Sequence, residues 1–213
     1  MKERNITVTL EKAREWFNNG NATLKAIALQ AFDENELVCN YKNITTFKKA
    51  CEALYLNYDI ISIIVTDVAI FSKASAAMFK LNIVRKALNL GQDLHLTKDP
   101  KGSHLYYPCS PFVTESSDYY KSELNSGEME VIGKFKSEGT LYKVLGGRAV
   151  YCGATGFGCF RPYDSVCFAD AVVGFLGCAS QEIAQHFGKY FGMLITEAKY
   201  GDMVDFEIIE SKY

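Results

Sequence analysis

Apolar residues recur at intervals of three and four along the first ninety positions, which is the spacing of amphipathic helices. The pattern predicts four helices, and Thr9, Thr46 and Ser72 stand where three of them would begin. We expect Gly20 and Gly91 to end the first helix and the fourth. The four apolar faces are Leu10, Ala13, Trp16 and Phe17; Leu24, Ile27, Ala31 and Phe32; Phe47, Ala50 and Leu54; and Met78, Leu81, Val84 and Leu88. Such faces pack against a core far more often than they bind a cofactor.

After residue 91 the pattern changes to short extended pieces separated by turns rich in Pro, Ser and Gly. Residues 104–107, 130–135 and 204–209 are predicted as strands, and Ser180 is predicted to cap a helix before the last of them. The face of that helix consists of Ile183, Phe187, Tyr190, Phe191, Leu194 and Ile195, with the small residues Gly188 and Gly192 beside them. We expect the two glycines to permit close packing.

Together these elements predict an α+β protein with a helical N-terminal portion, residues 1–95, and a second domain, residues 96–213. The chain has 213 residues, of which 48% are hydrophobic and 23% charged, as in ordinary globular proteins. Its formal net charge of -2 gives no reason to expect a nucleic-acid partner. We also expect no membrane insertion and no signal peptide, because neither a long apolar run nor an apolar N-terminal region occurs. Cytoplasmic synthesis is therefore expected, and the final location stays open.

The residues available for catalysis or metal binding form no familiar motif. Seven cysteines are an odd number, and those after residue 150 lack paired CxxC spacing, so we interpret them as reduced thiols and expect no metal site and no cofactor. A cysteine-dependent enzyme would need a histidine, and the chain offers His95, His104 and His186. His186 is interpreted as a helix-packing residue and the other two as parts of a solvated loop. We interpret Glu128, Glu130 and Glu138 as a solvated face rather than a catalytic pair.

The composition changes abruptly between Gly146 and Gly177, a stretch that we call the 146–177 window. It contains no Lys, Glu, Gln, Met, Trp or Asn, although Lys and Glu are frequent elsewhere. Within the window, chemically diverse residues alternate with small ones, as in the run from Arg148 to Val150. Alternation in an extended chain sends the two sets to opposite faces. One face would then be plain, and the other would carry charged, aromatic and thiol groups.

Two hypotheses explain this composition. In the first, many codons of the window descend from AAC or AAT with both adenines randomised, and the genetic code then excludes Lys, Glu, Gln, Met and Trp. In the second, the window is a packed β segment whose glycines and alanines leave no room for long side chains. The second accounts poorly for Arg148, Arg161, Asp164 and Asp170, because unpaired charges are not packed against an apolar core. Composition alone leaves both hypotheses open.

The small and apolar residues in and beside the window, together with strings that flank it, resemble those of a known protein family. The framework is Leu145, Gly146, Gly147, Ala149, Gly153, Gly156, Gly158, Phe160, Val166, Ala169, Ala171, Val173, Gly174 and Phe175. The flanking strings are TLEKAREWF, ALQAF, MFKLNIVRKALN, YYP and EIAQHFGKYF. In this order they resemble the target proteins of diversity-generating retroelements from gut Bacteroides and their phages, over most of the chain. In that family a reverse transcriptase copies a template with errors at adenines, in agreement with the first hypothesis.

The resemblance implies a C-type-lectin-like fold for the second domain, with variable side chains displayed to solvent. It implies a hypervariable, receptor-binding or adhesin-like protein that is not an enzyme, has no cofactor and binds a variable protein or glycan ligand. By position, the diversified ligand-binding residues are Arg148, Val150, Tyr151, Cys159, Arg161, Tyr163, Asp164, Phe168, Asp170 and Val172. The weaker candidates are Cys152, Phe157 and Cys167. Homo-oligomerisation and incorporation into a phage virion stay open. The alternatives are a cysteine-dependent enzyme on a scaffold like that of formylglycine-generating enzymes, and an undiversified structural virion protein.

Overall fold

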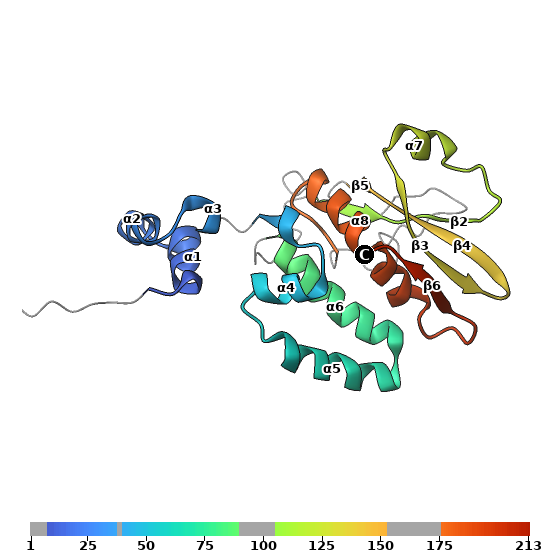
Figure 1. Cartoon of the computed structure of the whole chain (residues 1–213), viewed down its shortest axis with the longest axis horizontal. Coiled ribbons are helices and arrows are strands. Elements are labelled where there is room, and N and C mark those ends of the chain that lie inside the picture. Colours follow the sequence, from blue (N-terminus) through green and yellow to red (C-terminus); the bar gives the residue numbers. More distant parts are fainter. Residues whose placement is uncertain (1–7, 38–39, 90–104, 153–175) are drawn as a thin grey trace, which may run out of the picture. The chain divides into compact units, whose positions relative to one another are not determined.

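The computed structural model describes residues 8–37, 40–89, 105–152 and 176–213. The chain divides into two compact units, residues 1–40 and residues 41–213 (Figure 1). Helices and antiparallel sheets are both present, so the α+β class expected from the sequence is confirmed. Among the described residues, no helix combines the length and the apolar character that crossing a membrane requires.

The first unit is helical in its described part. Its elements are α1 (Leu10–Asn19), α2 (Ala22–Ala31) and α3 (Glu34–Leu37). Thr9 caps α1 as expected, because its hydroxyl accepts a hydrogen bond from the backbone N–H of Lys12. The buried core of this unit consists of Ala13, Ala28 and Leu37, with Val8, Trp16, Phe17 and Phe32 packed around it.

Helix α2 buries a different face from the one that its apolar pattern predicts. Its buried residue is Ala28, whereas Ile27 is 38% exposed and Ala31 is exposed as well. Apolar residues occur on most sides of this helix, so their spacing alone does not identify the side that meets α1. The small Ala28 shares the core with Ala13 of α1.

The second unit contains the remaining helices and all the described strands. The helices are η1 (Tyr41–Asn43), α4 (Phe47–Ala53), α5 (Tyr58–Phe71), α6 (Lys73–Leu88), α7 (Lys121–Ser126) and α8 (Gln181–Tyr200). Thr46, Ser72 and Ser180 cap α4, α6 and α8 with their side-chain oxygens, as expected. Helix α6 ends at Leu88, three residues before the predicted stop, and α5 is a helix that the apolar pattern does not predict.

The strands form two antiparallel sheets. They are β1 (Leu105–Cys109), β2 (Phe112–Thr114), β3 (Glu130–Ser137), β4 (Thr140–Gly146), β5 (Arg148–Cys152) and β6 (Glu207–Ser211). Strands β1 and β5 make a two-stranded sheet, and the other four pair in the order β2-β4-β3-β6. Glu138 and Gly139, both at positive φ, turn the β3–β4 hairpin. The last strand begins at Glu207, later than the predicted start at Val204, which is 99% exposed.

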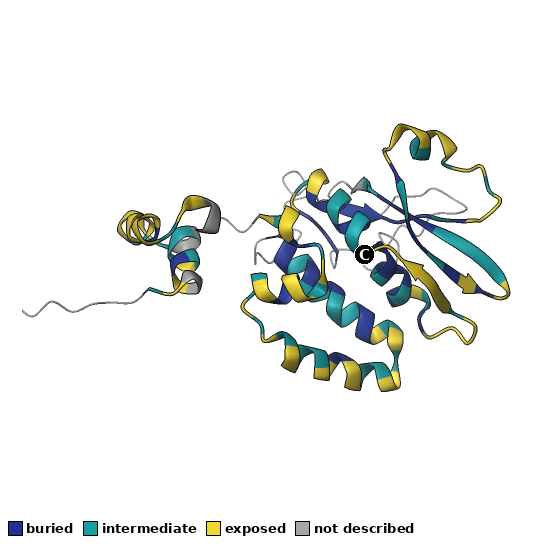
Figure 2. Ribbon diagram, in the orientation of Figure 1, coloured by how far each residue is buried: buried dark blue, intermediate teal, exposed yellow. Residues whose placement is uncertain are grey.

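Helix α8 is the central element of the second unit. It packs on one side against α6 and on the other against both sheets (Figures 1 and 2). Met193 of α8 joins Ile132, Phe135 and Val144 in the core beneath the four-stranded sheet. Because α4, α5 and α6 pack in this unit, the compact units divide at residue 40, not within the loose boundary expected near residue 95.

Candidate functional site

The 146–177 window begins at Gly146, the last residue of β4, and continues through Gly147 into strand β5, which pairs antiparallel with β1. Arg148 lies opposite Cys109, Val150 opposite Tyr107, and Tyr151 opposite Tyr106. Three of the ten predicted ligand-binding residues, Arg148, Val150 and Tyr151, therefore stand on one short strand. The sequence alternation that predicted an extended chain at Arg148 is confirmed by this strand.

The chain that follows the window is attached to the same strand, β1. Tyr106 donates a backbone hydrogen bond to the carbonyl of Cys178 (3.1 Å), and the N–H of Cys178 donates one to the carbonyl of Tyr106 (2.8 Å). Strand β1 thus holds β5 on one side and Cys178 on the other. Since neighbouring strands lie about 4.8 Å apart, the two attachments are separated by roughly 10 Å.

Asn89 fixes the same exit segment to helix α6. Its side-chain amide donates to the carbonyls of Arg85 (2.9 Å) and Gly177 (3.1 Å), and its side-chain oxygen accepts from the N–H of Ala179 (2.9 Å). Asn89 is 2% exposed; its hydrogen bond to Gly177 is buried, and the other two are partly buried. The apolar pattern does not predict this role; its sequence signal is an Asn that directly follows the last residue of the apolar stripe of α6.

The backbone just before β5 needs glycine. Gly147 has φ +107°, and a Cβ there would lie 3.0 Å from the carbonyl oxygen of Glu128. Leu145, two residues before Gly147, is fully buried. These two framework positions therefore support β5 through conformation and packing, as expected for a scaffold rather than for a ligand-contacting surface.

Helix α8 lies close beneath this region. A Cβ on Gly188 would be in ordinary contact, 3.4 Å from the carbonyl oxygens of Arg148 and Cys109. A Cβ on Gly192 would lie 2.6 Å from the Oγ of Ser110, which is buried. The prediction that these glycines permit close packing is therefore confirmed at Gly192, whereas the space at Gly188 would also admit a methyl group.

Arg148 is half-buried and lies near helix α7. Its positive charge helps to lower the pKa of Glu123, after the larger effect of the hydrogen bond from Ser122. Burial raises the pKa of the Tyr120 hydroxyl, and the charge of Arg148 opposes that rise. The start of the window thus carries a positive charge near α7. Tyr119, which precedes Tyr120 in the chain, is 63% exposed.

The other predicted ligand-binding residues lie outside the described residues. They are Cys159, Arg161, Tyr163, Asp164, Phe168, Asp170 and Val172. The weaker candidates Phe157 and Cys167, and the histidines His95 and His104, also lie outside them. Their roles stay predictions.

The thiols whose surroundings are described are buried. Cys51, Cys109 and Cys178 are free cysteines, and burial raises the pKa of the Cys51 and Cys178 thiols. His186 is half-buried, its Nε2 lies 2.8 Å from the carbonyl oxygen of Ile44, and burial lowers its pKa. These groups are held by packing, as interpreted from the sequence for His186. Within the described part of the chain no group of three or more His, Cys, Asp or Glu side chains could hold a metal ion.

The surroundings of Glu130 differ from the solvated acidic face expected from the sequence, because its carboxylate is partly buried and paired with two lysines. Its carboxylate pairs with Lys189 of α8 (2.6 Å) and with Lys212, and the hydroxyl of Tyr213 donates to it (3.2 Å). The side chain is 28% exposed. Partial burial alone would raise its pKa, but the hydrogen bonds from the two lysines outweigh burial and lower the pKa. Glu130 therefore ties the C-terminal residues and α8 to strand β3, whereas Glu128 is exposed.

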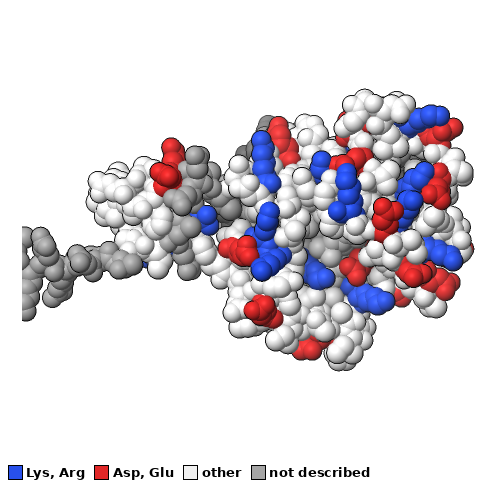
Figure 3. Space-filling view, viewed as in Figure 1, with Lys and Arg blue, Asp and Glu red and all other residues white. Residues whose placement is uncertain are grey.

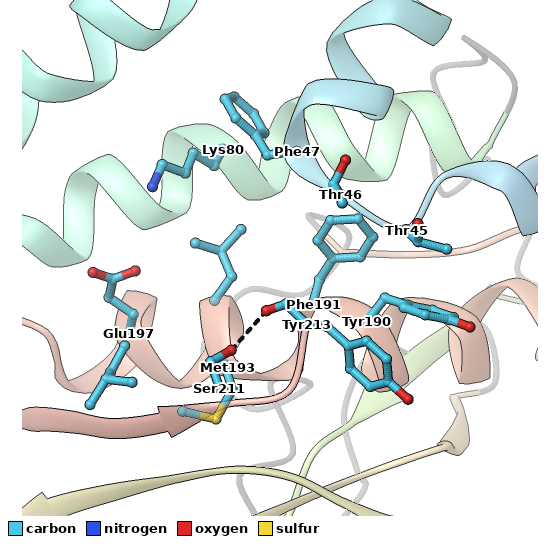
Figure 4. A pocket seen from close by; sticks show the side chains of 12 residues that line it. Thr45, Thr46, Phe47, Lys80, Tyr190, Phe191, Met193, Glu197, Ser211 and Tyr213 are labelled. Carbon is cyan, nitrogen blue, oxygen red and sulfur yellow. Dashed lines mark hydrogen bonds between the residues drawn. The ribbon is translucent and has the colours of Figure 1, made fainter.

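Two of the hollows in the second unit are lined by described residues. One of about 220 Å³ is lined by Glu130, Gly146, Gly147, His186 and Lys189, directly before β5. The other, of about 250 Å³, lies between α6, α8 and β6 (Figure 4). Its wall is mainly aromatic and aliphatic, and Lys80 and Glu197 stand near one end. Basic and acidic residues are interspersed on the face shown in Figure 3, which shows no single-sign patch for a nucleic acid.

Comparison with known proteins finds no similarity. Neither a protein-family model, nor a curated protein, nor a solved structure matches this chain. The functional argument therefore depends on the residues and on the geometry described above.

Proposed function

We propose that this protein is a non-enzymatic ligand-binding protein whose 146–177 window is diversified and displayed to a variable protein or glycan. The observation that carries the proposal is the attachment of the two ends of the window to strand β1, through β5 near the start of the window and through Cys178 directly after it. Both ends are held by backbone hydrogen bonds, which do not depend on side-chain identity. The residues between the attachments can then change without altering the support.

The composition of the window suits recognition. Affinity in protein interfaces concentrates in a few aromatic and Arg side chains, and Tyr offers a large contact area at a small entropic cost. Tyr151, Tyr163 and Phe168 are of this kind, and Arg148 and Arg161 add guanidinium groups. We propose that these residues form the ligand-binding surface, with Asp164 and Asp170 selecting partners by charge.

The finer part of the proposal is a C-type-lectin-like scaffold for the second unit. Its support is the family resemblance of the sequence, together with two antiparallel sheets packed on α8. Buried framework residues such as Leu145 keep one side of the support unchanged while the other varies.

A cysteine-dependent enzyme is less well supported. A nucleophilic cysteine must reach its thiolate form, which an apolar environment disfavours. Burial raises the pKa of both Cys51 and Cys178, and the carbonyl of Ile44 occupies Nε2 of His186. Among the described residues, these groups offer no activated thiol.

The decisive experiment is deep sequencing of this gene and its flanks across a bacterial or phage population. We expect changes to cluster between Arg148 and Val172 at adenine-templated codons, beside a near-copy of the window and a reverse transcriptase gene. A window that varies no more than the codons of α6 or α8 would overturn the proposal. It would instead favour a packed β segment in a structural protein.

A stability measurement tests whether the proposed contact residues are exposed. Replacing Tyr151, Tyr163 and Phe168 together by Ala should cost less than about 0.5 kcal/mol per site, as for surface substitutions. The matched control is Leu145→Ala in the buried framework, which should cost roughly 2–5 kcal/mol. A triple variant as unstable as the control would place these aromatic residues in the core and contradict their role in binding.

A further inference from the structure

The hollow between α6, α8 and β6 combines an apolar wall with two opposite charges at one end (Figure 4). Its volume is about 250 Å³, and it is called the α6–α8 hollow below. Phe191 in its wall is buried, whereas Ile208 is 38% and Tyr213 is 42% exposed. The apolar wall is therefore partly open to water, and a ligand that covered it would gain from the hydrophobic effect.

The charged residues of the wall are Lys80 of α6 and Glu197 of α8, and both are half-buried. Figure 4 shows them on two different helices at the same end of the hollow. Within the described part of the chain, neither side chain makes an ion pair or a hydrogen bond, with the other or with a third residue. A charge that is partly withdrawn from water without a partner is unfavourable. This end of the hollow therefore offers an ammonium group and a carboxylate to a ligand.

Several other polar groups of the wall already have partners. The hydroxyl of Thr46 accepts a hydrogen bond from the N–H of Lys49, and the hydroxyl of Ser211 donates one to the carbonyl of Tyr213 (2.7 Å). The hydroxyl of Tyr213 donates to Glu130. These bonds support the wall itself, so polar recognition of a ligand is expected at the charged end.

We propose that the α6–α8 hollow binds a free α-amino acid with a large apolar side chain. Such a molecule carries a carboxylate and an ammonium group on the same carbon atom, so it can satisfy both charges of the hollow together. Its carboxylate binds Lys80, its ammonium group binds Glu197, and its side chain fills the apolar part. Hydrogen bonds between charged groups are about twice as strong as neutral ones, so both should contribute to affinity.

A ligand with a single charge fits this arrangement less well. A carboxylic acid would pair with Lys80 but would bring its negative charge close to Glu197, and an amine would face the opposite conflict. Like charges at short distance repel each other. A neutral apolar ligand would cover both charges and leave them without partners. The two opposite charges therefore select a molecule that carries both signs.

The volume and the wall favour a side chain of the size of phenylalanine. Pockets for drug-sized ligands measure about 300–1,000 Å³, so this hollow suits a smaller molecule. Phe47, Tyr190, Phe191 and Tyr213 contribute aromatic rings to the wall, and such rings favour edge-to-face or offset contacts with another ring. L-phenylalanine is therefore the probe. The proposal does not rest on the proposed function of the 146–177 window.

Isothermal titration calorimetry of the full chain with L-phenylalanine tests the site. We expect saturable binding with a dissociation constant between about 10 μM and 1 mM, in the range for a ligand of this size. Phenethylamine lacks the carboxylate and 3-phenylpropionate lacks the ammonium group, so each should bind about tenfold more weakly or worse. No binding of L-phenylalanine at millimolar concentration, or equal affinities for the three compounds, would overturn the proposal.

Two charge variants test which group of the ligand each residue binds. Lys80→Met should weaken the binding of L-phenylalanine about tenfold but leave that of phenethylamine unchanged or stronger, because a repulsive cation is removed. Glu197→Gln should likewise weaken L-phenylalanine but spare 3-phenylpropionate. The controls Lys199→Met and Glu207→Gln remove exposed charges outside the hollow and should change none of the affinities. Equal losses for all three compounds in either hollow variant would contradict recognition by charge.

A blocking variant tests the location. Ile208→Trp adds bulk where β6 borders the hollow and should abolish the binding of L-phenylalanine. Ile208 is 38% exposed on an edge strand, so we expect the variant to fold, which circular dichroism checks. Ile209→Trp is the matched control, because Ile209 is 49% exposed and lies outside the hollow. Equal affinity of the two variants for L-phenylalanine would show that the α6–α8 hollow is not the site.

Discussion

The buried side chain of Asn89 makes three hydrogen bonds, and two of them hold the exit of the 146–177 window. Replacing Asn89 by Ala should cost roughly 3 kcal/mol, because the carbonyl of Gly177 would lose its partner in a buried place and the N–H of Ala179 would lose its partner in a partly buried one. Urea unfolding measures this loss. Hydrogen exchange at the amide of Ala179 should also become faster, because that N–H donates directly to Asn89.

Asn82 provides the matched control on the same helix. It is half-buried, and the hydrogen bond that its side-chain amide donates to the carbonyl of Met78 is long at 3.4 Å. Asn82→Ala should therefore change the stability by less than about 1 kcal/mol. Equal losses for Asn82→Ala and Asn89→Ala would mean that Asn89 does not hold the exit of the window.

Glu130 makes the stability depend on pH in the acidic range. Hydrogen bonds from Lys189 and Lys212 lower its pKa below the value of an unfolded chain despite partial burial. Its contribution is therefore present above the unfolded pKa, near 4.3, and is lost as the pH falls through the folded pKa. Glu130→Gln should cost about 0.5–1 kcal/mol at neutral pH, as is usual for partly exposed ion pairs.

The difference between the wild type and Glu130→Gln should shrink toward zero below about pH 4. Chemical unfolding at several pH values measures it. Glu128→Gln is the control, since Glu128 is an exposed acid two residues away. A difference that stays constant down to low pH would contradict the ion pairs of Glu130.

At the scale of elements, the contact between α8 and the sheets depends unequally on its two glycines. Gly192→Ala should destabilise the fold by roughly 1–3 kcal/mol, because the new methyl group would overlap Ser110 and Ile132 in a packed core. Gly188→Ala should be neutral or slightly stabilising. Its methyl group meets only ordinary contacts, and Ala favours a helix over Gly by about 1 kcal/mol. Thermal unfolding of both variants tests this order, and the reverse order would disprove the packing described.

Helix starts were predictable wherever a short polar side chain precedes an apolar stripe. Thr9, Thr46, Ser72 and Ser180 all cap the helices expected after them, because the signal is local. Helix α5 was not predicted, because its apolar residues fall on more than one side and weaken the periodicity that marks an amphipathic helix.

The site was predictable in part for the same reason. Alternation around Arg148 predicted an extended chain, and β5 lies there. The two attachments of the window could not be predicted, because Tyr106 and Asn89 are distant in sequence from Cys178 and Ala179. Local patterns carry no information about such long-range hydrogen bonds.

At the scale of the whole molecule, the two compact units differ greatly in the size of their buried apolar cores. The expected division near residue 95 followed the change in sequence texture, but α6 packs on α8 from the far end of the chain. The first unit keeps only forty residues and a small core around Ala13, Ala28 and Leu37. Units of this size bury too little apolar surface for high stability. We therefore expect the first unit to unfold at lower denaturant concentration than the second.

One residue makes this expectation measurable. Trp16 is the single tryptophan of the chain and packs in the core of the first unit, whereas strands β1 to β6 all belong to the second. Tryptophan fluorescence should therefore report an earlier urea transition than circular dichroism from the sheets and α8, because non-coincident transitions mark units that unfold separately. Trp16→Phe should abolish the fluorescence transition and leave the later one in place. Coincident transitions would show that the first unit unfolds together with the second, and its stability would then have to come from contacts beyond its own core.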